Sequence, residues 1–114
     1  MRILIVEPGK HPRVAEIENT LEKLQETVGG YIQAVYPWED NVALICDEEG
    51  LFKDTLWNRY IRRGLAIKGT FFICGIEGED FDDLPLGLAD KYMALLYDPQ
   101  IFLQTPNGVI VLKI

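Results

Sequence analysis

Two short polar segments of this sequence have the residue types that binding chemistry needs. The first, Glu7-Pro8-Gly9-Lys10, follows an apolar run and precedes a predicted helix. Backbone N–H groups at the start of a helix can bind an anion, so this segment is either an anion site or a capped turn. The second, Asp47-Glu48-Glu49-Gly50, carries carboxylates that suit a divalent cation. It lacks the alternating ligands of an EF-hand loop, and a solvated acidic turn is the simpler interpretation.

A third polar pair, Asn58-Arg59, lies between Trp57 and Tyr60. A guanidinium group at this position could bind an anion or a carboxylate of a partner. It could equally hydrogen-bond backbone carbonyl groups and tie a loop to the core, so both roles stay open. With the neighbouring base included, the candidate binding residues are Glu7, Lys10, Asp47, Glu49, Asn58, Arg59 and Arg62.

The composition excludes several classes of catalytic site. The sequence has no serine and one histidine, His11, which lies in a loop between two prolines and is expected to be solvated. No cluster of cysteine and histidine has the spacing of a zinc site. Neither of the glycine-rich patterns that bind nucleotide phosphates occurs. We therefore predict no catalytic residue, no metal site and no cofactor.

Charge is distributed unevenly along the chain. The net charge of −7 argues against a nucleic-acid partner, because nucleic-acid-binding proteins usually carry a basic surface. Residues 53–68 nevertheless contain five bases and one acid, and residues 77–83 contain five acids and no base. These segments are either solvated loops or two patches that meet a protein partner, or each other across a dimer.

The sequence predicts a soluble, cytoplasmic protein. No apolar run approaches the roughly 20 residues of a membrane-spanning helix, so no membrane partner is expected. The first apolar run ends at Glu7 and Pro8 and is too short for a signal peptide. Cys46 and Cys74 both lie in apolar runs and are predicted to be buried, reduced thiols. A disulfide would require their two strands to be neighbours.

The elements that position these residues can be predicted from hydrophobic patterns. The run Gly69-Thr70-Phe71-Phe72-Ile73-Cys74-Gly75 predicts a strand buried on both faces, and residues 2–6 predict a second. Residues 31–36 and 42–46 predict a β-hairpin. A helix over residues 12–28 follows from helical spacing of its apolar residues, which are Val14, Ile17, Leu21, Leu24 and Val28. Gly29-Gly30 should end this helix.

The second half of the chain is less regular. Residues 51–65 fit a short helix and an irregular loop equally well. Pro85 begins a second predicted helix that ends near Asp98, and residues 100–114 predict a C-terminal hairpin around Pro106-Asn107-Gly108. We predict one domain, residues 1–114, of the α+β class: a mixed or antiparallel sheet of about five or six strands with two packed helices. If both helices cover one face, the terminal hairpin or a second subunit must cover the other.

Five segments of the sequence resemble a known family. In chain order they are Val6-Glu7-Pro8-Gly9-Lys10, Val28-Gly29-Gly30-Tyr31-Ile32, Val42-Ala43-Leu44-Ile45-Cys46-Asp47-Glu48-Glu49-Gly50, Asn58-Arg59 and the strand at residues 69–75. They resemble small uncharacterised proteins of bacterial, phage and mobile-element genomes that are classed as a domain of unknown function. The resemblance covers residues 2–97 and excludes the terminal hairpin. It implies no activity, but it implies an accessory role in mobile-element or phage biology.

This sequence departs from the family pattern at two positions. The family commonly has asparagine where Asp47 stands, and a helix start containing serine or threonine where this chain has Asp83-Leu84-Pro85. The resemblance therefore assigns no role to Asp47.

The favoured hypothesis is a small, non-enzymatic protein-interaction module that binds a protein partner or a second copy of itself. One alternative is an acidic DNA mimic that inhibits a DNA-binding enzyme, although the basic segment argues against it. Another is a small-ligand or metal-dependent enzyme, which requires five residues to meet in one pocket: Glu7, Lys10, Asp47, Glu49 and Arg59.

Overall fold

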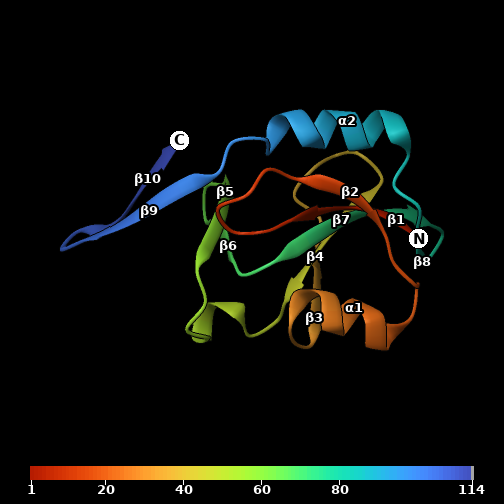
Figure 1. The fold of residues 1–114 in the computed structure, drawn as a ribbon, viewed down its shortest axis with the longest axis horizontal. Coiled ribbons are helices and arrows are strands. Elements are labelled where there is room, and N and C mark those ends of the chain that lie inside the picture. The colour runs from red at the N-terminus through yellow and green to blue at the C-terminus, as the bar shows by residue number, and fades with distance from the viewer. Residues whose placement is uncertain (114) are drawn as a thin grey trace.

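An antiparallel sheet lies at the centre of the computed structural model, which describes residues 1–113 (Figure 1). Its strand order is β2-β1-β7-β4-β3, and β8 pairs with the end of β7. The strands are β1 (Arg2–Val6), β2 (Arg13–Glu16), β3 (Ile32–Val35), β4 (Val42–Asp47), β7 (Phe71–Glu77) and β8 (Asp80–Asp82). All pairings in this sheet are antiparallel, so the antiparallel one of the two predicted arrangements is confirmed.

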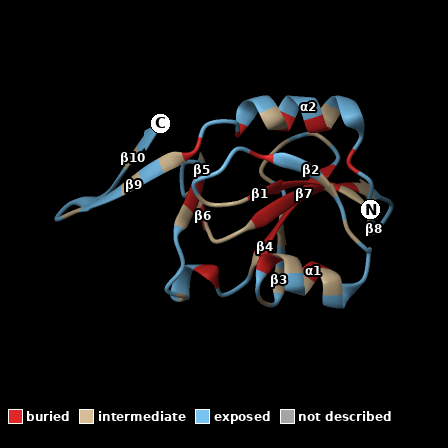
Figure 2. Ribbon diagram, in the orientation of Figure 1, coloured by how far each residue is buried: buried red, intermediate tan, exposed pale blue. Residues whose placement is uncertain are grey.

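The central strand is β7, which pairs with β1 on one side and β4 on the other. Its residues Phe71, Phe72, Ile73 and Cys74 are each 0% exposed, as a strand buried on both faces requires (Figure 2). Successive side chains of a strand point to opposite faces. Phe71 and Ile73 accordingly join one core cluster, and Phe72 and Cys74 join the other.

The two helices cover opposite faces of the sheet (Figure 1). They are α1 (Leu21–Val28) and α2 (Leu86–Leu95). Leu24 and Val28 of α1 belong to one core cluster, and Ala89 and Tyr92 of α2 belong to the other. Both faces of β7 are therefore covered by the chain itself. With two helices against so many strands, the protein is richer in sheet than the α+β class alone implies.

The predicted helix over residues 12–28 is wrong in its first half. Arg13–Glu16 forms the edge strand β2, which pairs with β1. The helix begins only after Thr20, whose hydroxyl group accepts a hydrogen bond from the Lys23 N–H. Val14 is 46% exposed and lies outside the helix. The helical spacing between Val14 and the later apolar residues therefore does not mark a buried helix face. The predicted C-terminal end of the helix is confirmed, because Gly29 caps α1 in the left-handed conformation, with φ of +82°.

Residues 57–68 form a second, two-stranded sheet where the sequence predicted a short helix or a loop. β5 (Trp57–Arg62) and β6 (Leu65–Lys68) pair antiparallel around Gly64, whose φ is +81°. Their register shifts twice, after Trp57 and after Tyr60. Such irregularities break the alternation of side chains that identifies a strand in a sequence. Upstream of them, a single 3-10 turn, η1 (Gly50–Phe52), is the helical part of this stretch.

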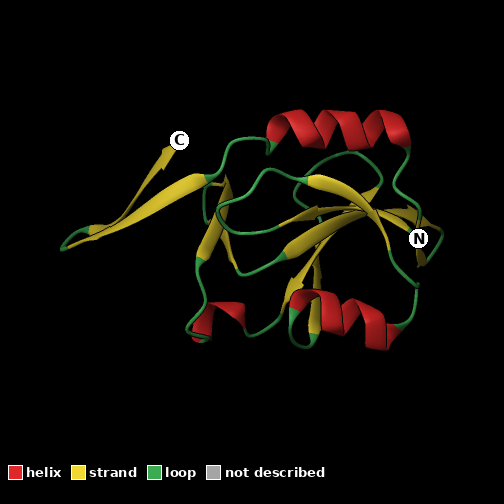
Figure 3. Cartoon of the chain, in the orientation of Figure 1, coloured by secondary structure: helices red, strands yellow, loops and turns green. Residues whose placement is uncertain are grey.

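The predicted terminal hairpin is present and extends away from the main sheet (Figure 3). It consists of β9 (Gln100–Thr105) and β10 (Gly108–Lys113). Residue 114, which the predicted range of the hairpin includes, lies outside the described residues. Trp57 of β5 stacks on Phe102 of β9, with ring centroids 5.4 Å apart. The backbone N–H of Tyr60 donates to Gln100 Oε1 over 2.8 Å. Residues 57–68 and 99–113 therefore form one end of the molecule, called the hairpin end below.

Cys46 and Cys74 are buried free thiols, as the sequence predicts. Their strands β4 and β7 are neighbours, but the two side chains belong to core clusters on opposite faces of the sheet. A disulfide between them is excluded by this geometry. Among the described residues, no helix has the length and apolar character needed to cross a membrane.

Candidate functional site

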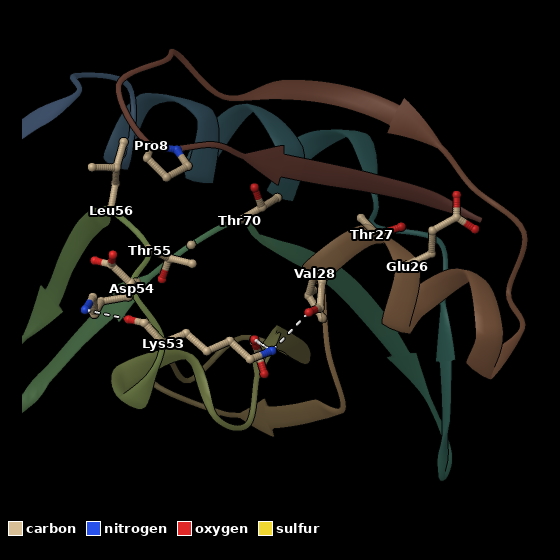
Figure 4. A pocket seen from close by; sticks show the side chains of 13 residues that line it. Pro8, Glu26, Thr27, Val28, Lys53, Asp54, Thr55, Leu56 and Thr70 are labelled. Carbon is tan, nitrogen blue, oxygen red and sulfur yellow. Dashed lines mark hydrogen bonds and ion pairs between the residues drawn. The ribbon is translucent and has the colours of Figure 1, made fainter.

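A polar pocket of about 400 Å³ opens beside the end of β4 and the start of β7 (Figure 4). Lys53 and Thr55 line it from the segment after η1, Thr70 lines it from the start of β7, and Glu26 lines it from α1. Pro8 lies on the opposite wall, directly after β1. The pocket thus joins segments that are far apart in the sequence.

An ion pair between Asp47 and Lys53 occupies the floor of this pocket. Lys53 Nζ lies 2.6 Å from Asp47 Oδ2 and also donates to the carbonyl oxygen of Gly29 over 3.1 Å. Asp47 Oδ1 accepts a hydrogen bond from the Glu49 N–H over 3.0 Å. The Asp47 side chain is 6% exposed, so these partners replace water around its carboxylate.

Gly30 makes room for the ion pair. A Cβ atom on this residue would lie 2.5 Å from Asp47 Oδ1 and 2.7 Å from Lys53 Nζ, which is closer than real Cβ contacts. A side chain at residue 30 would therefore push the two charged groups apart. The second glycine after α1 is needed for this close approach, whereas the first supplies the left-handed cap.

The other predicted acidic and basic sites lie elsewhere. Glu7 is held by two bases, with Arg13 Nη2 at 3.2 Å and Lys10 Nζ at 3.7 Å. Glu49 is exposed, and its backbone is what contacts Asp47. Of the five residues that the enzyme hypothesis requires in one pocket, Asp47 alone lines this pocket. Within residues 1–113, no group of three His, Cys, Asp or Glu side chains is placed to hold a metal ion.

Asn58 and Arg59 are fully buried and connect three parts of the fold. The Asn58 amide donates to the carbonyl oxygens of Val6, at 2.9 Å, and Gly69, at 2.8 Å. Arg59 Nε donates to the carbonyl oxygen of Leu96, at the end of α2, over 3.0 Å. This arrangement fits the second of the two roles left open by the sequence, in which the pair ties loops to the core.

The remaining contacts of Arg59 support the same role. Arg59 Nη1 donates to Asn58 Oδ1 over 3.0 Å, and Nη2 donates to the carbonyl oxygen of Lys10 over 2.6 Å. Burial lowers the pKa of the guanidinium, and the charge of Asp98 partly offsets this effect. Because its donors already point at protein carbonyl groups, the side chain is a poor candidate for binding an external anion.

The two charged segments of the sequence do not form simple patches. In the basic segment, Lys53 and Lys68 line the polar pocket, Arg59 is buried, and Arg62 is exposed at the end of β5. The acids of residues 77–83 are all exposed around the β7–β8 turn, at the opposite end of the molecule from the hairpin end (Figure 1). The two segments therefore cannot meet within one chain.

Asp40 forms a polar contact that the sequence pattern did not reveal. Its Oδ2 atom accepts hydrogen bonds from Lys91 Nζ, at 2.6 Å, and from the buried hydroxyl group of Tyr92, at 2.5 Å. These bonds, from Lys91 first and then Tyr92, lower the pKa of Asp40. The contact fixes α2 to the turn between β3 and β4, so its role is structural.

The hairpin end carries an exposed apolar surface that sequence analysis missed. On the outer face of the hairpin, Leu103 lies opposite Ile110, and Ile101 lies opposite Leu112. These four side chains are 45–50% exposed. The inner face of the hairpin borders a second, apolar cavity of about 370 Å³. In β9 this aliphatic row alternates with Gln100 and Gln104, a pattern that also suits a strand with its aliphatic face packed on the core.

Charge further distinguishes the hairpin end. It contains five of the eleven Lys and Arg residues and none of the eighteen Asp and Glu residues of the chain. Arg62, Arg63 and Lys113 are exposed, whereas Arg59 is buried and Lys68 lines the polar pocket. The remainder of the chain is strongly acidic. The protein is therefore polarised, with an apolar, basic end and an acidic body.

Comparison with known proteins identifies the family of the chain. The family model of a domain of unknown function (DUF3846) matches residues 1–97. The chain belongs to this family. No curated protein and no solved structure matches it. The predicted resemblance to such a family is confirmed, and the DUF3846 match ends before the terminal hairpin, as the sequence indicated.

In this DUF3846 chain, the segments that carry the resemblance surround the polar pocket. The pocket-lining residues among them are Pro8, Val28, Gly29, Asp47, Gly69 and Thr70. Asn58, from a further such segment, fixes the carbonyl groups on either side of it. These segments therefore meet at one junction of the DUF3846 fold, whereas the hairpin β9–β10 lies outside the matched residues.

Proposed function

We propose that this DUF3846 protein is a non-enzymatic protein-interaction module whose partner, an acidic protein, binds the hairpin end. The observation that carries the proposal is the combination of exposed aliphatic side chains and bases without acids at this end. Contiguous apolar surface on a soluble protein marks an interaction site. Complementary charge then selects the partner and accelerates its association.

The polar pocket supports a non-enzymatic role. A general base or nucleophile must be free to meet its substrate. Asp47 and Lys53 instead hydrogen-bond to each other and to the backbone. The pocket is therefore better suited to holding α1, β4 and the segment after η1 together than to chemistry.

A protein is favoured over a nucleic acid as the partner. The outer face of the hairpin presents Ile101, Leu103, Ile110 and Leu112, which offer no hydrogen-bond donor to phosphate or base edges. The acidic body would also repel a nucleic acid, since the net charge is −7. We place the interaction in mobile-element or phage biology, and the support for that placement is the family resemblance of the sequence.

Affinity capture from the native host, with three forms of the full chain as bait, tests this proposal. The first is the parent, and the second carries Leu103→Glu and Ile110→Glu on the outer hairpin face. The matched control carries Glu79→Gln and Asp80→Asn at the exposed turn of the acidic end. All these positions are exposed, so the fold should tolerate the changes.

We expect an acidic protein to be captured by the parent and the control, and its recovery to fall at least tenfold with the hairpin variant. Equal recovery by all three baits would overturn the proposal. The DNA-mimic alternative predicts the reverse pattern, in which the acidic-end variant loses the partner.

A further inference from the structure

We propose that the partner binds as an extended strand along the free edge of β10, through a segment in which acidic and aliphatic residues alternate. This inference rests on the proposed function and specifies how the hairpin end recognises its partner. Such strand addition derives affinity from main-chain hydrogen bonds and specificity from alternate side chains.

The outer edge of β10 is open. Within residues 1–113, β10 pairs with β9 alone, so its other edge has no neighbouring strand. An isolated two-stranded hairpin is marginally stable in water, and three strands with an apolar face are much more stable. A third strand added to β10 would therefore complete a sheet that the chain leaves unfinished.

The edge lacks the features that proteins use to prevent strand addition. Free edges are commonly protected by charged side chains, proline or a bulge. Residues 100–112 contain no charged residue, and β10 contains no proline. The register between β9 and β10 is continuous from Gly108–Thr105 to Lys113–Gln100, so no bulge interrupts it. β10 is thus an edge of six residues without a bulge, and its one charged residue, Lys113, stands at its end.

The faces of the hairpin define the side chains of the added strand. Successive residues of that strand would point to opposite faces. One set would extend the outer aliphatic row of Ile110 and Leu112. The other would lie on the face of Val111 and Lys113, where the exposed Lys113 is the base that β10 itself supplies. Aliphatic residues in the first set and acids in the second match both surfaces.

Charge also argues against a second copy of this chain as the occupant. A symmetric pairing of β10 with β10 of another molecule would bring two hairpin ends together. The exposed bases of each end, Arg62, Arg63 and Lys113, have no acid among them, so the pairing would bring two positively charged ends together. A partner segment with alternating acids has the opposite effect.

The test uses the full chain and a defined probe, the acetylated and amidated peptide (Glu-Val)₄. Amide hydrogen exchange is followed by NMR with and without saturating peptide. In an antiparallel pair, alternate residues turn their N–H groups away from the neighbouring strand. We expect the alternate amides of β10 that face away from β9 to exchange at least tenfold more slowly with peptide bound.

Two matched peptides control for the mode of binding and for charge. A version N-methylated at alternate residues keeps the side chains but loses one hydrogen-bonding edge, so its affinity should fall at least tenfold. The (Lys-Val)₄ peptide keeps the strand propensity but reverses the charge, and it should bind at least tenfold more weakly at low salt.

Four results would overturn the inference. They are unchanged exchange at β10, equal binding of the N-methylated peptide, equal binding of the lysine peptide, and displacement of the peptide by a single-stranded oligonucleotide. A dimer seen by sedimentation equilibrium, with β10 amides already protected, would instead assign the edge to a second copy. If host capture still depends on Leu103 and Ile110 while β10 exchange is unchanged, strand addition fails and the proposed function stands.

Discussion

Replacing Asn58 by alanine tests whether the buried polar pair holds the fold together. The change removes the two amide hydrogen bonds to the carbonyl oxygens of Val6 and Gly69, and also the bond that Arg59 Nη1 donates to Asn58 Oδ1. Arg59 Nη1 keeps its bond to the backbone carbonyl oxygen of Asn58, so the two freed carbonyl groups account for most of the cost. A buried acceptor left without a partner costs about 1–3 kcal/mol. The Val6 carbonyl contact is fully buried, whereas that of Gly69 is partly buried and can be reached by water. We therefore expect a loss of about 2–4 kcal/mol from a total stability of about 5–15 kcal/mol.

Urea unfolding, followed by the fluorescence of the tryptophans, measures this loss as a fall in the midpoint at an unchanged slope. Asn41→Ala is the matched control, because its amide also donates to one carbonyl, that of Ile76, but at an exposed site. The control should cost at most about 1 kcal/mol, since water can replace the lost bond. An Asn58→Ala variant as stable as the Asn41→Ala control would refute the structural role that we assign to the pair.

Three further predictions concern the pocket, the thiols and the β3–β4 turn. Gly30→Ala should destabilise the protein by about 1 kcal/mol in urea unfolding, because its Cβ atom would displace the ends of the Asp47 and Lys53 side chains and separate their ion pair; an unchanged midpoint would contradict this. Burial raises the pKa values of Cys46 and Cys74 to about 11 and about 12, so a thiol reagent should label them only under unfolding conditions, and rapid native labelling would disprove their burial. Hydrogen bonds lower the pKa of Asp40, so its contribution is present above the ordinary carboxyl pKa and is lost as pH falls through the lowered folded value. Asp40→Asn should therefore weaken the acid dependence of stability measured by urea unfolding at several pH values, and an unaltered dependence would argue against the contact.

Much of the main sheet could be predicted from the sequence because its signals are local. The central strand is an uninterrupted apolar run, and the β3–β4 hairpin has a clear turn cluster. The strand β2 could not be predicted, because its partner β1 lies across a proline-rich loop and pairing leaves no periodic trace. The β5–β6 sheet was hidden by its two register shifts. In both places the pairing of consecutive strands decided the structure, and the periodicity of side chains does not encode that pairing.

The candidate site was less predictable than the fold. The sequence indicates Asp47 and Arg59 as candidates because of their charge. It does not show that Lys53 forms an ion pair with Asp47, or that Arg59 donates to backbone carbonyl groups. The apolar surface of the hairpin escaped notice because its strands were assumed to pack on the core. The absence of acids from residues 57–68 and 99–113 was visible in the sequence. Only the structure shows that these two segments contact each other and so form one end of the molecule without acids.

The position of β7 has a consequence for synthesis and folding. β7 joins the β1–β2 pair to the β3–β4 pair, yet it follows all four strands in the chain. During synthesis on the ribosome, the edges of β1 and β4 that pair with β7 remain unpaired until β7 emerges. Ile73 then pairs with Leu4, which is synthesised well before it. Pairings between distant residues form slowly, so the apolar edges of β1 and β4 should stay exposed during this interval.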